Sequence, residues 1–478
     1  MDDENQNENF CNGSLNTLIS WQKHLKVRQM CQKFVMNNKK LTVFMNVLSN
    51  LIDLGLKKET HDTSTIRCFQ TYAQDIPTGN EQGRYIALDL GGSNFRVLNI
   101  ELDVGRQFRM DQETFSCSKQ LMAGSGEELF DYIAQCLKDF LTKRKLESEI
   151  NLPLGFTFSF PIYQSRLDSA ILTNWTKGFT CDGVVGNDVV KLLNRSIAKH
   201  SGLNIKVCVI LNDTVGTLMS CAWKDPNTKI GLIIGTGTNC CYLEKIDRIE
   251  MFDGDSSKEE MVINLEWGAF GDKGELDDII TKYDKTVNRN SVNPNQQTFE
   301  KMVSGMYLGE LFRLLLLDMA KNNLIFDGHV PEILLVPQSI TTNVISTVES
   351  DVPETYTLSR QCLQKLGIEN VTESDLLNIR YAAHCISRRS AELVAAGLAV
   401  LLERMNEENI TIGVDGSVYR LHPYYHQILV NKVNELVKGK SIKIMLSEDG
   451  SGRGAAVLAA ALNQVHCIYF VVILNLEL

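Results

Sequence analysis

The sequence predicts an α/β protein built as two lobes, and three observations support this fold class. The apolar run 205–211 is followed directly by Asn-Asp-Thr-Val-Gly-Thr, the pattern of a buried strand that ends where a helix begins. Two strand–turn–strand units, at 85–102 and 230–243, each carry glycines and hydroxyl side chains at the turn. Stretches with apolar residues three and four positions apart predict the surrounding amphipathic helices.

Length and charge limit the function classes. The 478 residues are enough for two to four domains, each with its own hydrophobic core. With 44% hydrophobic and 22% charged residues, the composition is that of an ordinary globular protein. The net charge of −10 argues against a surface for nucleic acid or for anionic membranes.

The cysteines and the first residues predict a cytoplasmic location. The 13 cysteines are scattered and no C-x-x-C pair occurs, so the sequence suggests neither a zinc site nor a disulfide framework. Reduced thiols in the cytosol are the simplest interpretation. The stretch 1–9 is acidic and polar, unlike a signal or transit peptide, and we expect a disordered tail at 1–14.

The first predicted elements are helices between about Leu15 and Leu56. Apolar residues such as Val27, Met30 and Phe34 recur at spacings of three and four, which places them on one helix face. Such a face packs into a core, and we assign it no function.

The first strand–turn–strand unit combines Tyr85–Leu90, the turn Gly-Gly-Ser-Asn at 91–94, and Phe95–Leu102. Its glycines let backbone N–H groups approach a ligand, and Ser93 and Asn94 add side-chain donors. Such a turn can hold a phosphate, with Arg96 nearby to supply charge. Alone, it is equally well explained as an ordinary hairpin turn.

The second unit repeats this design about 145 residues later. Strand 230–234 leads into Gly-Thr-Gly-Thr-Asn at 235–239 and then to strand 240–243. No Walker A loop occurs in the sequence. We therefore expect a nucleotide to be held between two lobes, by two turns that act as halves of a phosphate clamp.

Asp213 should lie where the strand 205–211 ends and a helix over 214–223 begins, with Asp213 or Thr214 as the N-cap. Open α/β sheets bind their ligands at such points. The positive helix end would hold the carboxylate ionised, as a general base requires. Taken alone, the stretch is better explained by an aspartate that merely caps the helix.

A third glycine cluster, Gly-Ser-Gly-Arg-Gly at 450–454, precedes the Ala-rich helix predicted over 455–462. A helix N-terminus can bind an anion. The spacing also fits a dinucleotide fingerprint after the strand 442–446, but the chain ends before the second strand and the acidic residue that this fold requires. The Rossmann interpretation therefore fails.

A polar constellation between these landmarks suits a polyol. It comprises Ser159–Pro161, Asn174–Gly178, Asn264–Gly268 and Phe299–Lys301. Carboxylates and amides that pair with each hydroxyl reject analogues lacking one. Each residue also has a simpler explanation: a glutamate in the first turn of the amphipathic run 299–321, for example, complements the helix dipole.

Nine segments in order resemble the hexokinase family. They cover roughly 15–462, and any one could arise by chance, whereas nine in order could not. The segments are Asp-Leu-Gly-Gly-Ser-Asn-Phe-Arg (89–96), Ser-Phe-Pro (159–161), Trp-Thr-Lys-Gly-Phe (175–179), Leu-Asn-Asp-Thr-Val-Gly-Thr (211–217), Gly-Thr-Gly-Thr-Asn (235–239), Glu-Trp-Gly-Ala-Phe-Gly-Asp (266–272), Phe-Glu-Lys-Met-Val-Ser-Gly-Met-Tyr-Leu-Gly-Glu (299–310), Gly-Val-Asp-Gly-Ser-Val-Tyr (413–419) and Ser-Glu-Asp-Gly-Ser-Gly (447–452).

The resemblance implies a role for each matching position. Asp213 resembles the catalytic base that takes the proton of the sugar 6-hydroxyl, with Lys177 beside it. The implied hexose ligands are Ser159, Thr176, Lys177, Asn212, Asp213, Asn239, Glu266 and Glu300. The implied ATP and phosphate set is Asp89, Gly91, Gly92, Ser93, Asn94, Arg96, Thr236, Gly237, Thr342, Ser346, Gly416, Ser417 and Ser451, with Asp89 near the waters of the magnesium ion.

The resemblance also implies a two-lobed fold of the actin-like ATPase (ribonuclease H-like) type, with each lobe a mixed sheet flanked by helices. It implies N-terminal helices of the large lobe at 15–72, a small lobe at 73–211, a large lobe at 212–451 and a returning helix at 452–466; the apolar tail 467–478 is atypical. ATP and Mg²⁺ are the implied cofactors, without direct protein ligands to the metal. We expect a monomer with a hexose and Mg-ATP as partners, no nucleic acid and no membrane span.

Two interpretations follow. The first is an ATP-dependent hexokinase that makes hexose 6-phosphate, the first step of glycolysis, with glucose, mannose and fructose all compatible. A narrower hexose or amino-sugar kinase is its nearest rival. The second is a sugar-binding sensor of hexokinase ancestry with little turnover. The base, Lys177 and the glycine turns are all retained, which favours the enzyme. Ile340 replaces a phenylalanine of the family, which places adenine affinity in doubt more than the chemistry.

Overall fold

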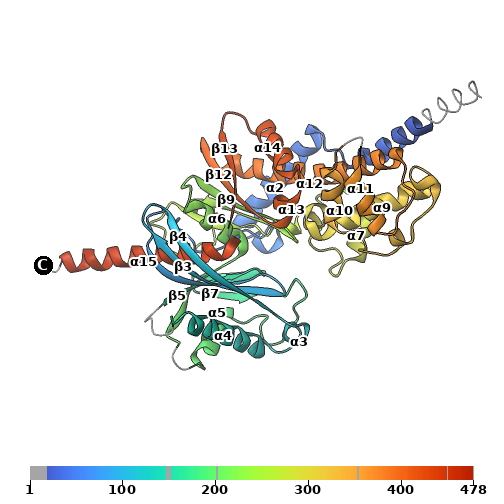
Figure 1. The fold of residues 1–478 in the computed structure, drawn as a ribbon. Coiled ribbons are helices and arrows are strands. Elements are labelled where there is room, and N and C mark those ends of the chain that lie inside the picture. Colours follow the sequence, from blue (N-terminus) through green and yellow to red (C-terminus); the bar gives the residue numbers. More distant parts are fainter. Residues whose placement is uncertain (1–18, 147–151, 201–202, 353–354, 449, 477–478) are drawn as a thin grey trace, which may run out of the picture.

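The computed structural model describes residues 19–146, 152–200, 203–352, 355–448 and 450–476. The predicted tail 1–14 lies outside these ranges. The described residues form two sheet-and-helix lobes, which Figure 1 shows one above the other. Residues 19–31 are helical and α2 (Asn38–Leu56) follows, with Asn37 as its N-cap. No helix in the described ranges is both long and apolar enough to cross a membrane.

The small lobe is built on a five-stranded mixed sheet of order β4-β3-β2-β5-β8. Its strands are β2 (Gly83–Leu90), β3 (Asn94–Asp103), β4 (Gln107–Ser116), β5 (Leu152–Phe158) and β8 (Ile205–Leu211). The pairs β2–β3 and β3–β4 are antiparallel, whereas β2–β5 and β5–β8 are parallel. A small antiparallel hairpin, β6 (Ile162–Arg166) and β7 (Ser169–Leu172), follows β5.

Both faces of this sheet are covered, so its central strands are buried along most of their length. Ile86 and Leu88 of β2 face a core formed with α3 (Lys119–Met122), α4 (Gly126–Lys143) and α5 (Val189–Ala198). Tyr85 and Ala87, on the opposite face, pack into a second core with α6 (Asp213–Ala222) and α15 (Gly450–Leu476). This alternation follows from the two-residue period of a strand.

The large lobe is built on a six-stranded sheet of order β1-β11-β10-β9-β12-β13. Its strands are β1 (Phe69–Gln70), β9 (Thr228–Ile234), β10 (Thr238–Lys245), β11 (Glu260–Asn264), β12 (Asn409–Asp415) and β13 (Ser441–Leu446). Its helices beyond α2 are α7 (Lys282–Asn290), α8 (Thr298–Val303), α9 (Gly305–Lys321), α10 (Thr342–Ser350), α11 (Thr357–Lys365), α12 (Glu373–Met405), α13 (Ser417–Leu421) and α14 (Tyr425–Leu436). Single 3₁₀ turns are η1 (Gln32–Phe34), η2 (His61–Thr63), η3 (Ile246–Arg248), η4 (Trp267–Ala269), η5 (Phe326–Gly328) and η6 (Glu332–Leu335).

The two sheets share one plan. In each, an antiparallel hairpin with a glycine turn (β2–β3, β9–β10) is joined to two parallel strands (β5 and β8, β12 and β13). The last parallel strand of each sheet leads into a helix, α6 or α15, and Figure 1 shows the first part of α15 between the sheets. The predicted two-lobed α/β fold with mixed sheets is confirmed.

The helices α6 and α15 cross at glycines. A Cβ built on Gly454 would lie 1.9 Å from the carbonyl oxygen of Gly216, and one built on Gly216 would lie 2.5 Å from that of Ser451. Only glycine allows backbones to approach this closely. The third glycine cluster therefore sets a helix crossing, and in the described ranges α15 is the last element after β13. The helix continues past residue 466, while the segment boundaries given above stay predictions.

The prediction of one helix over 299–321 is wrong. Two helices, α8 and α9, meet at Ser304, whose backbone is extended (φ −92°, ψ 157°). The break has a tertiary cause. The first N–H groups of α9, at Gly305 and Met306, donate to the carbonyl oxygens of Gly235 (2.8 Å) and Thr236 (3.2 Å). The start of α9 is thereby attached to the second glycine turn.

Candidate active site

Asp213 is the first residue of α6, at the end of β8. Asn212 caps this helix: its side-chain oxygen accepts from the backbone N–H (2.7 Å) and the hydroxyl (2.6 Å) of Thr214. The prediction that Asp213 or Thr214 is the N-cap is wrong, because Asn212 carries the extended backbone (φ −83°, ψ 164°) that an N-cap requires. The Asp213 carboxylate is thereby released from capping, and 21% of its side chain is exposed.

Three influences compete for the pKa of Asp213. Burial is the largest and raises this pKa, because the charged form loses hydration. The Lys177 ammonium group, 4.0 Å from Oδ2, lowers it, and so does the N–H of Thr214 at the helix start. The carboxylates of Asp89 and Asp415 raise it again. The net shift is upward, toward the range in which a carboxylate can accept and return a proton.

Lys177 reaches Asp213 from the small lobe. Its backbone is left-handed (φ 55°) and Gly178 follows at φ 85°, so the chain turns sharply after β7. Its Nζ donates to the carbonyl oxygen of Ser159 at 2.7 Å. Thr176 precedes it, and the Thr176 carbonyl oxygen accepts from the N–H of Phe179 at 3.1 Å to close the turn. Lys177 and Ser159 are therefore held together beside the start of α6.

The side chain of Glu266 is surrounded by amides. Its Oε1 accepts from the Nδ2 groups of Asn239 (2.8 Å), Asn264 (2.9 Å) and Asn212 (3.5 Å). Glu266 has left-handed backbone (φ 51°), which turns the chain out of β11 and into η4. Burial raises its pKa, and the amides of Asn264 and Asn239 act in the opposite direction. The result is a fixed array of donors and acceptors around one carboxylate.

Glu300 of α8 completes the polar group. Its Oε2 accepts from the backbone N–H of Thr238 at 3.0 Å. A Cβ built on Gly237 would lie 2.4 Å from this oxygen, which explains a glycine at that position. Burial raises the pKa of Glu300 to about 7, and the charges of Lys177, Glu266 and Asp213 all act on it. These four side chains thus form one electrostatic unit.

The two glycine turns lie at the ends of the hairpins, as predicted. Gly91 packs against Ser159, whose backbone N–H donates to the carbonyl oxygen of Leu90 at 3.0 Å. The space around a Cβ built on Gly92 is open, and Thr236 in the second turn is exposed. Both turns therefore present small residues and accessible backbone. Ser93 lies between Gly92 and β3, and Asn94 is the first residue of β3.

Arg96, which we expected to supply charge beside the first glycine turn, forms an ion pair within the hairpin. Its guanidinium group is paired with the buried carboxylate of Asp89, with which it aligns in the β2–β3 register. The hydroxyl of Ser451 donates to the same carboxylate at 3.4 Å. Asp89, Arg96 and Ser451 therefore form one group that joins the first hairpin to the start of α15.

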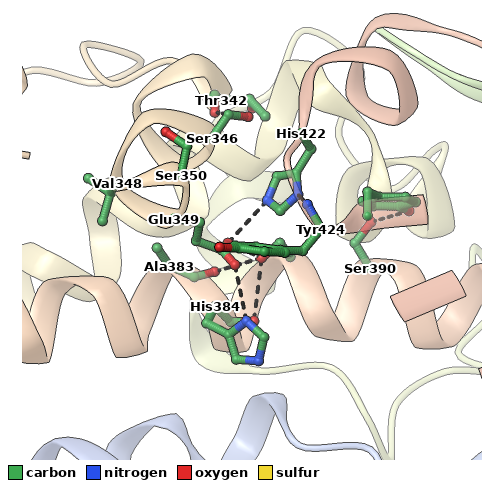
Figure 2. A network of polar contacts seen from close by, with 12 residues as sticks. Thr342, Ser346, Val348, Glu349, Ser350, Ala383, His384, Ser390, His422 and Tyr424 are labelled. Atoms are coloured by element: carbon green, nitrogen blue, oxygen red, sulfur yellow. Dashed lines mark hydrogen bonds and ion pairs between the residues drawn. The ribbon is translucent and has the colours of Figure 1, made fainter. Parts of the chain in front are cut away.

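Four residues of the implied ATP and phosphate set lie on α10 and around α13. The Thr342 hydroxyl donates to the carbonyl oxygen of Gly305 (2.6 Å) and accepts from the N–H of Gly309 (3.1 Å), so it is occupied by α9. Ser346 lies one turn further along α10, as Figure 2 shows. Gly416 has φ 117°, which favours glycine, and Ser417 begins α13. A Cβ built on Gly235 would lie 3.4 Å from Gly416, which places this segment beside the second turn.

Two further residues belong to the site but were not among the implied ligands. Asn264, part of the predicted polyol constellation at 264–268, donates to Glu266, and Asp415 ends β12 close enough to Asp213 to raise the pKa of Asp213. The signal for Asp415 was present, since it lies at the end of a strand, directly before Gly416, within the matching segment 413–419. The Asp415 carboxylate accepts from the Nε of Arg420 at 2.9 Å. In the described ranges no group of three or more His, Cys, Asp or Glu side chains is arranged to hold a metal ion.

The hexokinase family matches this chain in two parts, at residues 26–223 and 229–461. Human Hexokinase-1 is 43% identical over 414 residues, which cover 85% of this chain and 45% of the relative. Human Hexokinase-2 is also 43% identical, over 417 residues that cover 86% of this chain and 45% of the relative. The chain therefore spans about half the length of these curated relatives.

Two solved structures match along nearly their whole length. A hexokinase from Schistosoma mansoni, in complex with glucose, superposes with a TM-score of 0.85 at 41% identity. The match covers 92% of this chain and 99% of that one. A second structure, described as a hexokinase, has a TM-score of 0.80 at 32% identity and covers 93% and 99% of the two chains.

Proposed function

This chain belongs to the hexokinase family, and we propose that it transfers the terminal phosphoryl group of Mg-ATP to the 6-hydroxyl of a hexose. The observation that carries the proposal is the placement of Asp213. It begins a helix that another residue caps, and it lies 4.0 Å from Lys177. A carboxylate that has a raised pKa and a neighbouring cation, and that does not serve as the helix N-cap, is suited to general-base catalysis.

In this mechanism Asp213 takes the proton of the sugar hydroxyl as that oxygen attacks the terminal phosphorus. General-base help of this kind is worth about 10²–10⁴ in rate. The Lys177 ammonium group stabilises negative charge at the reacting centre. The remaining acceleration would come from positioning the two substrates in line and from neutralising the phosphate charges.

The hexose is held by side chains that the structure brings together from both lobes. Glu266 and Glu300 supply acceptors for sugar hydroxyls, and Asn212 and Asn239 supply amides beside them. Ser159 and Thr176 line the small-lobe side next to Lys177. We propose glucose as the first substrate to test, because the matched Schistosoma mansoni hexokinase is described in complex with glucose. Mannose and fructose fit the same ligand set.

The nucleotide is proposed to lie between the two glycine turns, with its base toward α10 and α13. The donor chemistry fits Mg²⁺ carried by ATP, because the carboxylates of Asp89 and Asp415 are near enough to Asp213 to raise its pKa, and oxygen ligands suit this ion. When bound, Mg²⁺ would neutralise charge on the phosphates. Asp89 would hold its waters rather than coordinate it directly, since Arg96 and Ser451 already contact that carboxylate.

We also propose a cytosolic location. The described cysteines carry free thiols, which agrees with a reducing compartment.

The test is sugar-dependent release of ADP by the purified chain with Mg-ATP, measured separately with glucose, mannose and fructose. Asp213→Ala is the blank, and Asp247→Ala, at an exposed position on η3, is the matched control. Sugar-dependent ADP from the unsubstituted chain and the control only would support the enzyme. Glucose binding without ADP release would favour the sensor alternative.

A further inference from the structure

A cluster of polar side chains surrounds one buried carboxylate on the segments assigned to the nucleotide. It consists of Glu349 on α10, His384 and Ser387 on α12, and His422 directly after α13, and we call it the Glu349 cluster. Figure 2 shows His384 and His422 on two sides of the Glu349 side chain, of which only 2% is exposed. None of them has a role in the chemistry described above.

The hydrogen bonds of the cluster fix both charge and tautomer. Oε1 of Glu349 accepts from the Ser387 hydroxyl and from Nε2 of His422 at 3.1 Å, and Oε2 accepts from Nδ1 of His384 at 3.0 Å. The backbone N–H of Tyr424 donates to Nδ1 of His422 at 3.2 Å, so that nitrogen is an acceptor. Nε2 of His422 therefore carries the proton and donates it toward Glu349.

The charge on Glu349 is maintained by these donors. Burial alone raises the pKa of Glu349, but the hydrogen bonds from His384 and His422 reverse this and hold the pKa at about 2. Loss of a hydrogen-bond donor to a buried carboxylate is costly, so these contacts favour one arrangement of the cluster. Other charged or titratable groups on or beside the neighbouring elements include Asp351, Arg380, Cys385, Arg388, Arg389, Glu392, Arg420, His426 and Lys432.

The cluster joins the two segments proposed to hold the nucleotide. Ser346 lies three residues before Glu349 on α10, so the two share one helix face. Ser417 begins α13, and this helix ends at Leu421, directly before His422. Since α13 is a single short helix, its ends are only about 6–8 Å apart at a rise of 1.5 Å per residue. The bond between Glu349 and His422 therefore sets the separation of Ser346 and Ser417.

The sugar-facing residues depend on other elements. Asp213 is placed by α6, Glu300 by α8, and Glu266 by the turn after β11. None of these elements carries a member of the Glu349 cluster. A change in the cluster should therefore reach the nucleotide before it reaches the sugar.

We propose that Glu349 is a positioning residue for the nucleotide: through His422 it fixes the spacing of α10 and α13, and thereby the affinity for Mg-ATP. This inference rests on the proposed function, because it deepens the assignment of Thr342, Ser346, Gly416 and Ser417 to the nucleotide. It predicts an effect on the KM for Mg-ATP that is separate from the KM for the hexose and from kcat.

The experiment compares substitutions in the full chain. Glu349→Gln keeps the shape of the side chain, but it removes the charge and presents an NH₂ group to the donors. His422→Asn breaks the connection from the α13 side. Both should raise the KM for Mg-ATP by about 3- to 30-fold, the range typical of coupling through packed elements, while the KM for glucose and kcat change less than about twofold.

Two controls separate positioning from general damage. His384→Gln loses a donor from α12 but leaves the bond between Glu349 and His422, so it should change the KM for Mg-ATP much less. Glu244→Gln is the matched buried carboxylate. Glu244 accepts from Arg404 (2.9 Å) and from the Tyr242 hydroxyl (2.6 Å), at the end of β10 away from Asn239. It should lower the melting temperature without a selective effect on Mg-ATP.

Three outcomes would overturn the inference. They are an unchanged KM for Mg-ATP in folded Glu349→Gln and His422→Asn, an equal rise of both KM values, and the same Mg-ATP effect in Glu244→Gln. If Glu349→Gln does not fold, His422→Asn decides. Equilibrium binding of Mg-ATP to each variant keeps the two proposals distinct. If the unsubstituted chain binds Mg-ATP but shows no sugar-dependent turnover, the proposed function is rejected. The role of Glu349 is then still tested by comparing the affinities of the variants for Mg-ATP. Absence of nucleotide binding in the unsubstituted chain rejects both.

Discussion

Nζ of Lys177 lies 4.0 Å from Oδ2 of Asp213, and it also donates to the carbonyl oxygen of Ser159 at 2.7 Å. One ammonium group thus connects a turn of the small lobe with the first residue of α6. Its charge opposes the effect of burial on the pKa of Asp213. This relationship makes the pH dependence of the proposed reaction a direct test of the site.

Lys177→Met should shift the pH profile of kcat/KM. Lys177 lowers the pKa of Asp213, so its removal raises that pKa and moves the loss of activity on the acid side to higher pH. The value of kcat should also fall. The measurement is the rate of hexose phosphorylation as a function of pH, from mildly acidic to mildly alkaline buffer. Lys191→Met, on an exposed side chain of α5, is the control and should leave the profile in place; an unshifted profile for Lys177→Met would remove the lysine from this role.

Glu300→Gln should make the folded chain more stable and weaken its affinity for the sugar. Burial raises the pKa of Glu300 to about 7, so its charged form is penalised in the folded chain and the penalty grows as pH rises from about 4.5 to about 7. The substitution should therefore raise the melting temperature at pH 8 and have less effect at pH 5. The KM for glucose should rise at pH 8, because an ionised acceptor is lost. A melting temperature that drops equally at both pH values would contradict the assignment.

Asn212→Ala should remove the N-cap of α6 and disturb the base that follows it. The loss of such a cap costs about 0.5–2 kcal/mol of stability. The matched control is Asn37→Ala, since Asn37 caps α2 through a bond from the N–H of Lys40 at 2.9 Å. Both variants should melt at lower temperature, but only Asn212→Ala should also lower kcat. Equal activities in the two variants would show that the cap has no catalytic consequence.

His384→Gln should destabilise the chain more at pH 6 than at pH 9. The hydrogen bond with Glu349 raises the pKa of His384 above 6.5. The stabilisation is therefore complete below the unfolded pKa and is lost as pH rises through the higher folded pKa. Urea unfolding at the two pH values measures this, with His329→Gln on an exposed histidine as the control. A destabilisation independent of pH would mean that His384 acts only by packing.

Much of the fold was predictable because local patterns agree with the tertiary structure. The run 205–211 is β8, and both glycine turns join the expected antiparallel strands. The family membership and the two-lobed fold predicted from the nine segments are confirmed. The roles of the individual site residues stay predictions, although the structure brings Asp213, Lys177, Glu266 and Glu300 together.

The errors have tertiary causes that sequence patterns do not contain. The run 299–321 has helical periodicity throughout, but the N–H groups of Gly305 and Met306 donate to carbonyl oxygens of the second glycine turn, and the run is divided at Ser304. Asn212 and Asp213 are both good capping residues, and only the backbone geometry decides between them. The pairing of Arg96 with Asp89 depends on the register of two strands. The Glu349 cluster joins residues up to 73 positions apart, so no local sequence pattern predicts it.

The central claim, that Asp213 is the base of a phosphoryl transfer to a hexose, is tested most directly by comparing turnover and sugar binding in Asp213→Ala. Trp175 packs on Phe160 and Phe179 beside Lys177 and offers a fluorescence signal for glucose binding. The account predicts that kcat with Mg-ATP and glucose falls by at least about 10²-fold while glucose still binds. Turnover equal to that of the unsubstituted chain would contradict it.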